Sequence, residues 1–275
     1  MLSFITWTAD PDLFHIGGLT VRWYGLLWAS AVWVALLVVQ KTFKHEKCPE
    51  IWGEKLFYYG AGGLVIGARL GHCLFYGSGD DFFYYYRNPF EILFIWEGGL
   101  ASHGGAIGLL TAMYLFNRNV IKKGYLWMLD RLVLGVAIGG ALIRFGNLMN
   151  HEVYGCQTDV PWAFRFILNI HSWQKGAEPF FSQPSHPTQI YEMLYCLITF
   201  AVIMYMYWKT KAAQRTGLIF GVFLVGIFFT RFLLEFIKET QVSFEEGMML
   251  NMGQLLSIPF FLAGFYFIFR KIKKC

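Results

Sequence analysis

Residues 100–108 read Leu-Ala-Ser-His-Gly-Gly-Ala-Ile-Gly, which places a histidine and three glycines inside a long apolar segment. Small residues in a membrane helix let a neighbouring backbone approach closely. A titratable imidazole is costly inside a bilayer unless the protein uses it. The stretch therefore predicts a membrane helix whose histidine, His103, is functional. The alternative is a packing glycine cluster with an incidental histidine.

The composition predicts an integral membrane protein. The 275 residues are 56% hydrophobic and 15% charged, whereas a soluble domain carries about 25% charged residues. Long apolar runs alternate with short polar spacers, so we expect an all-α protein and not a β-barrel, whose segments are short and alternating. Residues 1–275 are expected to form one membrane domain. The five cysteines include no CxxC pair, so neither a disulfide framework nor a structural zinc site is predicted.

Seven segments have about the 20 mostly apolar residues that a membrane span needs. They are residues 21–40, 56–76, 92–116, 127–149, 189–208, 217–237 and 252–270. Fourteen basic residues lie in the connections on one side of this bundle and at the carboxyl terminus, and four lie on the other side. Basic loops are typical of the cytoplasmic face. The amino terminus is therefore predicted outside and the carboxyl terminus inside, and the basic charge is a topology signal that does not indicate a nucleic-acid partner.

The longest outside connection, residues 150–188, is rich in phenylalanine and tryptophan. Aromatic side chains are typical of a membrane interface. We expect this connection to lie on the outer interface as a small head or amphipathic arm of the seven-helix bundle. An ordinary aromatic anchor and a substrate-guiding segment both remain open.

Arginines interrupt three of the predicted spans at similar depth. With a rise of about 1.5 Å per residue, Arg69, Arg144 and Arg231 lie roughly 20–25 Å from the inner face, in the outer half of a core about 30 Å thick. His103 is expected near the middle of the membrane, and Tyr24 begins the first span at its outer end. The shared depth predicts one cavity that opens to the outer leaflet.

The spacing of polar residues supports a shared cavity. Arg144, Asn147 and His151 stand at i, i+3 and i+7, so they are expected on one helix face. Arg231 and Glu235 stand at i and i+4 and can pair, either within the site or as a buried structural ion pair. Because guanidinium groups bind phosphate through two parallel hydrogen bonds, the cavity predicts an anionic phospholipid headgroup.

Several chemistries could use such a cavity. His103 could act as a general base or acid near neutral pH, and Tyr24 could orient the substrate, transfer a proton or simply anchor the helix at the interface. His103, His151 and His186 with Glu152 or Glu192 form an alternative metal site, but no HExxH spacing is present. Ser102 precedes His103 without a GxSxG elbow. We therefore predict neither a metal nor a cofactor.

Ordered motifs along nearly the whole chain resemble the prolipoprotein diacylglyceryl transferase family. The matching segments are Trp23-Tyr24-Gly25, Arg69 through Tyr76, His103-Gly104-Gly105, Arg144-Phe145-Gly146-Asn147 with Asn150, Glu152 and Gly155, His186-Pro187-Thr188-Gln189 with Tyr191-Glu192, Arg231 with Glu235, and Met252-Gly253-Gln254 with Ser257-Ile258-Pro259. The chain departs from the family pattern at His151, where glycine is frequent, and at Ile227, where tyrosine is common.

The resemblance implies a multi-pass enzyme of the bacterial inner membrane that begins lipoprotein maturation. It would move the diacylglyceryl group of phosphatidylglycerol to the lipobox cysteine thiol of a prolipoprotein signal peptide, form a thioether and release glycerol phosphate. The implied activity and lipid-binding residues are Tyr24, His103, Arg144, Asn147, Glu152, Gly155, Arg231 and Glu235. Arg69 joins the lipid-binding set because of its depth in the membrane.

Two questions stay open from the sequence. The thiol could be activated by His103, or electrostatically by Arg144 and Arg231, which would also hold the phosphate. The same polar cavity could belong to a transporter or lipid flippase, which would move its substrate without a covalent change. A purely structural scaffold would leave the clustered arginines unexplained.

Overall fold

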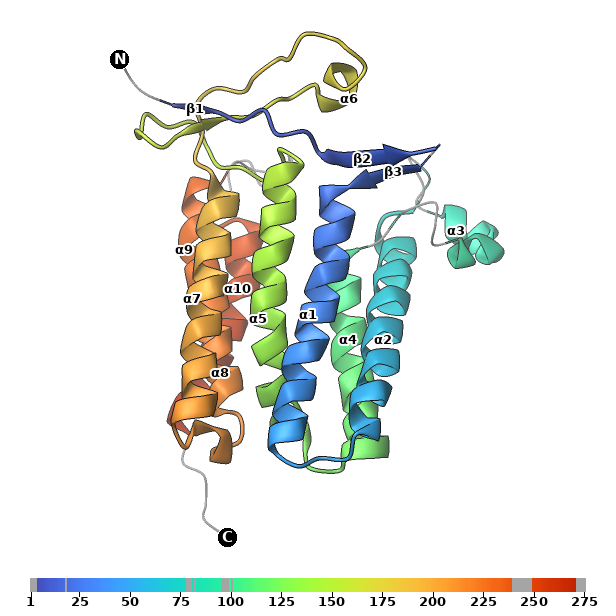
Figure 1. Ribbon diagram of the computed structural model, residues 1–275, viewed down its shortest axis with the longest axis vertical. Helices are drawn as coiled ribbons and strands as arrows, with labels where there is room; N and C mark the ends of the chain where they lie inside the picture. The colour runs from blue at the N-terminus through green and yellow to red at the C-terminus, as the bar shows by residue number, and fades with distance from the viewer. Residues whose placement is uncertain are drawn as a thin grey trace. The chain divides into compact units, whose positions relative to one another are not determined.

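The computed structural model describes residues 4–17, 19–77, 81, 83–94, 99, 101–238 and 249–270, without the side chains of Leu19 and Ser102. Leu100 of the opening stretch and the predicted cytoplasmic cluster at residues 271–274 lie outside the described residues. The described chain is mostly helical (Figure 1). It contains two compact units, a first unit of Met1–Ala35 with Leu132–Cys275 and a second unit of Leu36–Arg131.

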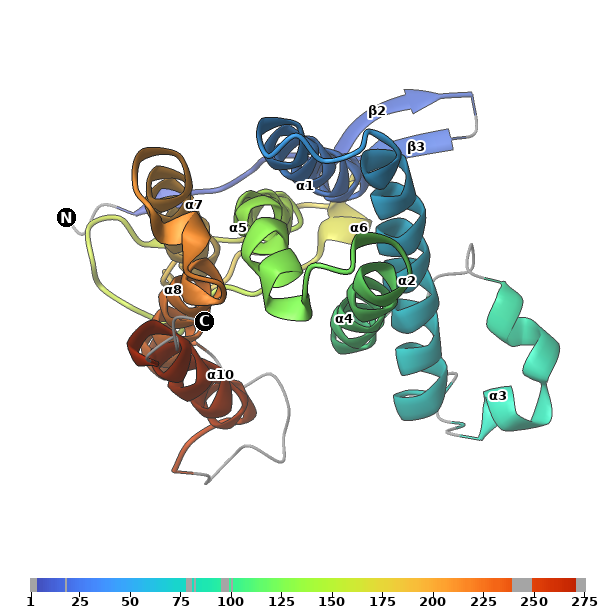
Figure 2. The ribbon, with the colours of Figure 1, turned by 90° about the horizontal axis from the view of Figure 1, so that it is seen from below.

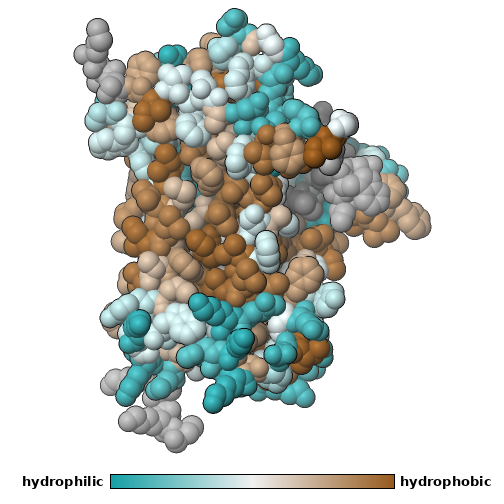
Figure 3. All heavy atoms as spheres, in the orientation of Figure 1, coloured by the Kyte–Doolittle hydropathy of each residue, from teal (hydrophilic) through white to brown (hydrophobic). Residues whose placement is uncertain are grey.

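Five helices are long and apolar enough to cross a membrane, which confirms a helical membrane protein. They are α1 (Trp23–His45), α5 (Tyr125–Met149), α7 (Thr188–Lys209), the helical run Leu218–Ile237 and α10 (Met252–Phe269). Apolar side chains gather over the middle of these helices, and polar side chains gather toward the ends (Figure 3). In the first unit, α7, α8 and α10 lie side by side (Figures 1 and 2).

Small residues bring α1 and α5 together in the first unit. A Cβ atom added to Gly135 would lie 2.5 Å from the carbonyl oxygen of Ala35, so the two backbones nearly touch. Gly146, three turns further along α5, lies against the ring of Tyr24 in the same way, at 2.9 Å from its Cδ2 atom. This packing places the start of α1 beside the last turns of α5.

The sixth predicted span is a helix with an irregular middle. It begins as α8 (Leu218–Leu224), widens into the π-helical η5 (Val225–Phe229), continues as α9 (Thr230–Leu234) and ends as the 3₁₀ helix η6 (Glu235–Ile237). The hydroxyl of Thr230 donates to the backbone carbonyls of Gly226 and Ile227 within this widened turn. Such π-helical turns occur mostly as single insertions in α-helices, often at functional sites.

The two remaining predicted spans correspond to α2 (Ile51–Phe75) and α4 (Ser102–Phe116) of the second unit. The sequence predicted one helix over 92–116, but η1 (Pro89–Leu93) is a separate 3₁₀ helix, and Gly99 has a φ of +71° that no continuous helix allows. The 15 residues of α4 run directly into the π-helical η3 (Asn117–Ile121). α2 has 25 residues and α4 has 15, and neither is among the five described helices that are both long and apolar enough to cross a membrane.

The glycines of the opening stretch pack α4 against α2. A Cβ atom on Gly67 would lie 2.4 Å from the carbonyl oxygen of Gly104 and 2.6 Å from the Cα atom of Gly108. These distances exclude any side chain, so the predicted close approach of another backbone is confirmed within the second unit.

This contact makes a testable stability prediction. Gly67→Ala should force α2 and α4 apart and lower the free energy of unfolding by about 1–3 kcal/mol, the usual cost of overpacking. Gly62→Ala adds the same methyl group where nothing lies within 4 Å, and it is the matched control. Thermal unfolding of both purified variants in detergent checks the prediction, which fails if they unfold at the same temperature.

Two small sheets and an irregular segment complete the first unit. Strand β1 (Ile5–Thr6) pairs in parallel with β4 (Phe164–Arg165), and β2 (Asp12–Ile16) pairs antiparallel with β3 (Leu19–Arg22). Residues 150–188 contain β4 and the short α6 (Ile170–Trp173), and they pack Phe164 and Phe166 against Leu148 at the end of α5. The amino-terminal strand and this long connection therefore form one packed layer over the end of α5.

Candidate active site

A buried glutamate of α7, Glu192, contacts two basic side chains of the site. The side chain of Glu192 is fully buried, and its two carboxylate oxygens face two different cations. Oε2 lies 2.8 Å from Nε of Arg144, and Oε1 lies 2.8 Å from Nζ of Lys238. Among the described residues these two cations are the only partners of the carboxylate. Since an unpaired buried charge costs several kcal/mol, the two cations together compensate the charge of the buried carboxylate.

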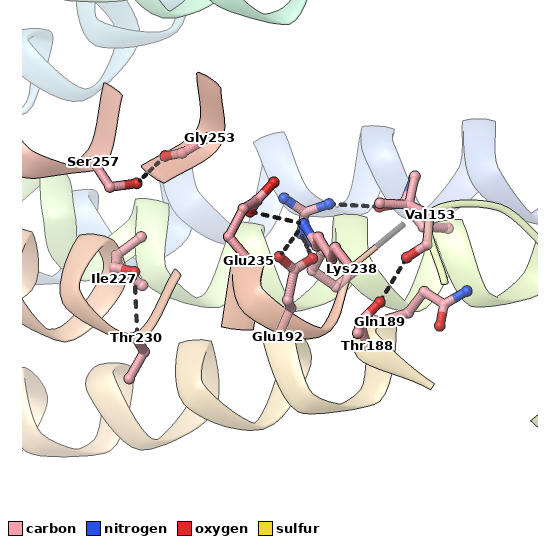
Figure 4. Close-up of polar contacts among 12 residues, drawn as sticks. Val153, Thr188, Gln189, Glu192, Ile227, Thr230, Glu235, Lys238, Gly253 and Ser257 are labelled. Carbon is pink, nitrogen blue, oxygen red and sulfur yellow. Dashed lines mark hydrogen bonds and ion pairs between the residues drawn. The ribbon is translucent and has the colours of Figure 1, made fainter. Parts of the chain in front are cut away.

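The second acid of the site, Glu235, pairs with Lys238. Its Oε2 atom lies 3.6 Å from Nζ of Lys238, whose side chain is only 4% exposed. Figure 4 shows Lys238 between the carboxylates of Glu192 and Glu235. We call Arg144, Glu192, Glu235 and Lys238 the buried ion cluster. Gly253 of α10 leaves room for it, because a Cβ atom there would lie 2.4 Å from Oε1 of Glu235.

The side chain of Arg144 is partly exposed and contacts two neighbouring residues. Its Nε atom contacts Glu192, its Nη1 atom donates to Oδ1 of Asn147 at 3.2 Å, and its side chain is 23% exposed. Asn147 in turn donates from Nδ2 to Oε1 of Glu152 at 2.8 Å. Arg144 and Asn147 thus share a helix face as the spacing predicts. The remaining nitrogen, Nη2, has no hydrogen-bond partner among the described residues, so it can donate to a ligand.

His151 does not join this face, which corrects the i, i+7 prediction. Helix α5 ends at Met149, and His151 has a left-handed backbone with φ of +56°. Its Nδ1 accepts the backbone N–H of Ile167 at 3.0 Å, and Nε2 lies 2.8 Å from the carbonyl of Ala9, to which it donates. Burial lowers the pKa of His151. Both ring nitrogens therefore form hydrogen bonds to the backbone, and His151 cannot serve as a metal ligand in this arrangement.

The turn after α5 is held by the first turn of α7. Val153 has a φ of +61°, which is an uncommon conformation for a β-branched residue and stores strain. Its carbonyl accepts the hydroxyl of Thr188 at 2.8 Å (Figure 4). The carbonyl of Glu152 accepts a hydrogen bond from Nε2 of Gln189 at 2.7 Å. The Thr-Gln pair of the sequence motif thus fixes the turn that carries Glu152.

Tyr24 and Arg231 also belong to this site in the first unit. The half-buried Tyr24 interacts electrostatically with both Glu152 and Arg144. Arg231 is within electrostatic range of the buried Tyr195, as Arg144 is. The Nε atom of Arg231 is buried without a hydrogen-bond partner among the described residues. A buried unsatisfied donor costs about 1–3 kcal/mol, so Arg231 is suited to bind an anion.

The predicted pairing of Arg231 with Glu235 is wrong. Among the described residues Arg231 forms no ion pair, and Glu235 faces Lys238 instead. The i, i+4 rule assumes a regular α-helix, but Glu235 begins the tighter 3₁₀ helix η6 directly after Arg231's short α9. Lys238 supplies the cation that the spacing assigned to Arg231, at 3.6 Å from Oε2 of Glu235.

Gly155 brings the end of η6 to the site. Gly155 forms an antiparallel bridge with Lys238, and the N–H of Cys156 donates to the carbonyl of Ile237 at 2.8 Å. A Cβ atom on Gly155 would lie 2.5 Å from that same carbonyl oxygen. The glycine therefore allows a close backbone contact that fixes the position of Lys238.

Arg69 and His103 lie in the second unit, and their proximity to Arg144 stays a prediction. The buried guanidinium of Arg69 donates to the carbonyls of Glu91 at 2.6 Å and Ile92 at 2.9 Å. These bonds give Arg69 a role in holding the connection between α2 and α4. The side chain of His103 is exposed at the start of α4, beside the rings of Phe75 and Tyr76 at 5.4 and 5.7 Å.

Sequence reasoning missed Lys238, which was counted among the four outside loop cations. The available signal was its place three residues after Glu235 in a segment that already contains Arg231. A lysine directly after a span ordinarily reaches the interface, so the spacing alone did not indicate burial.

Comparisons with known proteins agree with the motifs. Residues 11–270 match the family "Prolipoprotein diacylglyceryl transferase". A phosphatidylglycerol–prolipoprotein diacylglyceryl transferase of Porphyromonas gingivalis is 48% identical, over 98% of this chain and 96% of that protein. Proteins of the same name from Chloroherpeton thalassium and Bacteroides fragilis are 42% and 40% identical, over 99% and 100% of this chain and 96% and 98% of those proteins. The chain therefore belongs to the prolipoprotein diacylglyceryl transferase family and is a transferase of lipoprotein biosynthesis.

Proposed function

We propose that this chain transfers the diacylglyceryl group of phosphatidylglycerol to the lipobox cysteine thiol of a prolipoprotein signal peptide. The names of its relatives supply the substrates. The observation that carries the residue assignment is the pair of arginines with donors left open, Nη2 of Arg144 and the buried Nε of Arg231. Both can donate to phosphate oxygens, and neither needs a cofactor or a metal to do so.

The reaction forms one bond and breaks one bond. The thiolate sulfur attacks the glycerol carbon that carries the phosphate, and a thioether forms. The bond between that carbon and the phosphate oxygen breaks, and its electron pair leaves with glycerol phosphate. Arg144 and Arg231 stabilise the leaving phosphate by charge-assisted hydrogen bonds. The thiol proton leaves to His103 or to solvent, with the thiolate favoured by the arginine charges.

The other residues of the first unit support the phosphate-binding arginines. Asn147 and Glu152 fix one edge of Arg144, and Tyr24 lies close enough to orient the substrate. Arg69 and His103 of the second unit are proposed as site residues from their predicted membrane depth and from the family resemblance alone.

The proposed topology has seven membrane segments, formed by the five apolar helices together with α2 and α4. The amino terminus would lie outside the inner membrane and the carboxyl terminus in the cytoplasm, because basic loops favour the cytoplasmic face. Residues 150–188 would form a small periplasmic head on one continuous membrane domain. The lipid substrate then enters from the outer leaflet.

A direct assay tests the activity. The purified protein is incubated with phosphatidylglycerol vesicles and a synthetic lipobox peptide, and the peptide is analysed by mass spectrometry. We expect a diacylglyceryl mass increase on the peptide and release of glycerol phosphate in equal amount. A peptide with serine in place of the lipobox cysteine is the control and should stay unmodified. Movement of the lipid between leaflets with no mass increase would instead establish a flippase.

A further inference from the structure

Lys238 is buried between two carboxylates, whereas a lysine in a loop after a membrane span ordinarily extends to the interface. Its ammonium group is almost completely buried and lies 2.8 Å from Glu192 and 3.6 Å from Glu235. Its backbone pairs with Gly155, and the neighbouring Ile237 accepts a hydrogen bond from Cys156. Burial of a lysine is costly and is tolerated where acids compensate the charge. The chain thus fixes both the backbone and the side chain of Lys238 at the acid that holds Arg144.

The geometry divides the charge of one carboxylate between two cations. Glu192 gives Oε2 to Arg144 and Oε1 to Lys238, each at 2.8 Å, and it has no further partner among the described residues. If Lys238 were neutral, the whole charge of Glu192 would act on Arg144. The carboxylate would then compete with a phosphate for the guanidinium group, because both are anions that bind the same donors.

We propose that Lys238 is a positioning residue for transfer. It binds Glu192, so that the carboxylate orients Arg144 through Nε without neutralising the charge that Arg144 offers to the phosphate. The role of Lys238 is therefore to keep Arg144 available to an anionic headgroup, and it acts through Glu192 without touching the substrate. This inference rests on the proposed function of Arg144.

The first test compares Lys238→Met with Lys238→Arg in the peptide transfer assay. Lys238→Met should lower kcat/KM for phosphatidylglycerol about tenfold or more, within the range of coupling between neighbouring charges. Lys238→Arg keeps the charge and should restore most of the activity. The KM for the lipobox peptide should stay unchanged, because the effect acts on the phosphate. Lys175→Met removes an exposed lysine of the same unit and is the matched control.

The second test is a double-mutant cycle with Glu192→Gln. Once residue 192 is neutral, it no longer draws on the charge of Arg144, so Lys238→Met should change kcat/KM less than about threefold in the Glu192→Gln background, even though Lys238 still faces Glu235 there. A merely structural lysine would give the same loss in both backgrounds. If Lys238→Met alone does not fold, the comparison of Glu192→Gln with the double variant decides: equal transfer supports the role, and a further large loss in the double variant contradicts it.

The outcomes separate this inference from the proposed function. Wild-type activity in Lys238→Met, together with an inactive Arg144→Ala, overturns the role of Lys238 and leaves the phosphate site intact. Absence of any peptide modification by the unchanged protein overturns the proposed function itself. A loss that Lys238→Arg does not restore and that raises both KM values alike shows a structural lysine and also overturns the inference.

Discussion

Arg144→Ala is expected to lower kcat of diacylglyceryl transfer about 1000-fold, the upper end of the effect of removing one preorganised hydrogen-bond donor. The alanine removes the guanidinium group that contacts Glu192 through Nε and that belongs to a side chain 23% exposed. The leaving phosphate would then depend on Arg231 alone. The measurement is the initial rate of peptide mass increase with phosphatidylglycerol in excess.

Three controls make the Arg144 result interpretable. Arg144→Lys keeps a charge but cannot form the planar fork, so it should retain only a small part of the activity. His103→Gln should reduce transfer without abolishing it, because the arginines are proposed to do most of the work. Arg87→Ala, which removes an exposed surface arginine, should behave as wild type. Near-normal transfer by a folded, membrane-inserted Arg144→Ala protein would refute the assignment of the phosphate site.

The sequence predicted this site best where local geometry is regular. Arg144 and Asn147 stand on a regular stretch of α5, so their i, i+3 spacing translates directly into a contact. The glycines of residues 100–108 likewise predict a close backbone contact, although the partner helix could not be named from spacing. These inferences depend only on the spacing of residues in a regular helix and on the positions of glycines, and both can be read directly from the sequence.

The prediction failed where the backbone changes type. His151 follows the end of α5, and its left-handed backbone turns the ring toward Ala9 and Ile167. Glu235 lies where α9 ends and the 3₁₀ helix η6 begins, and it pairs with Lys238, whereas no ion pair with Arg231 is found among the described residues. Such transitions are fixed by tertiary contacts, here the hydrogen bonds between Cys156 and Ile237 and between Thr188 and Val153. These tertiary hydrogen bonds cannot be inferred from the helical spacing of residues in the sequence.

Gly155→Ala is expected to lower kcat/KM for phosphatidylglycerol at least about tenfold, which is within the coupling expected for neighbouring charges. The added Cβ atom would lie 2.5 Å from the carbonyl oxygen of Ile237, 2.8 Å from Cγ2 of Thr188 and 2.9 Å from Cβ of His186. Two of these three atoms belong to the backbone or lie next to it, so the segment that ends at Lys238 must move. Lys238 would then withdraw from Glu192, and Arg144 would lose its available charge.

The loss caused by Gly155→Ala should come from a displaced charge and not from a lost ligand contact. Overpacking should also lower the free energy of unfolding by about 1–3 kcal/mol, so activity is compared below the unfolding transition. Adding Glu192→Gln to Gly155→Ala should restore part of the loss, because a neutral side chain no longer needs Lys238. Gly62→Ala, with open space around its methyl group, should leave transfer unchanged.

If Gly155→Ala transfers at the wild-type rate, the backbone contact with Ile237 does not position the buried ion cluster. If the double variant recovers nothing, Gly155 acts on the lipid itself.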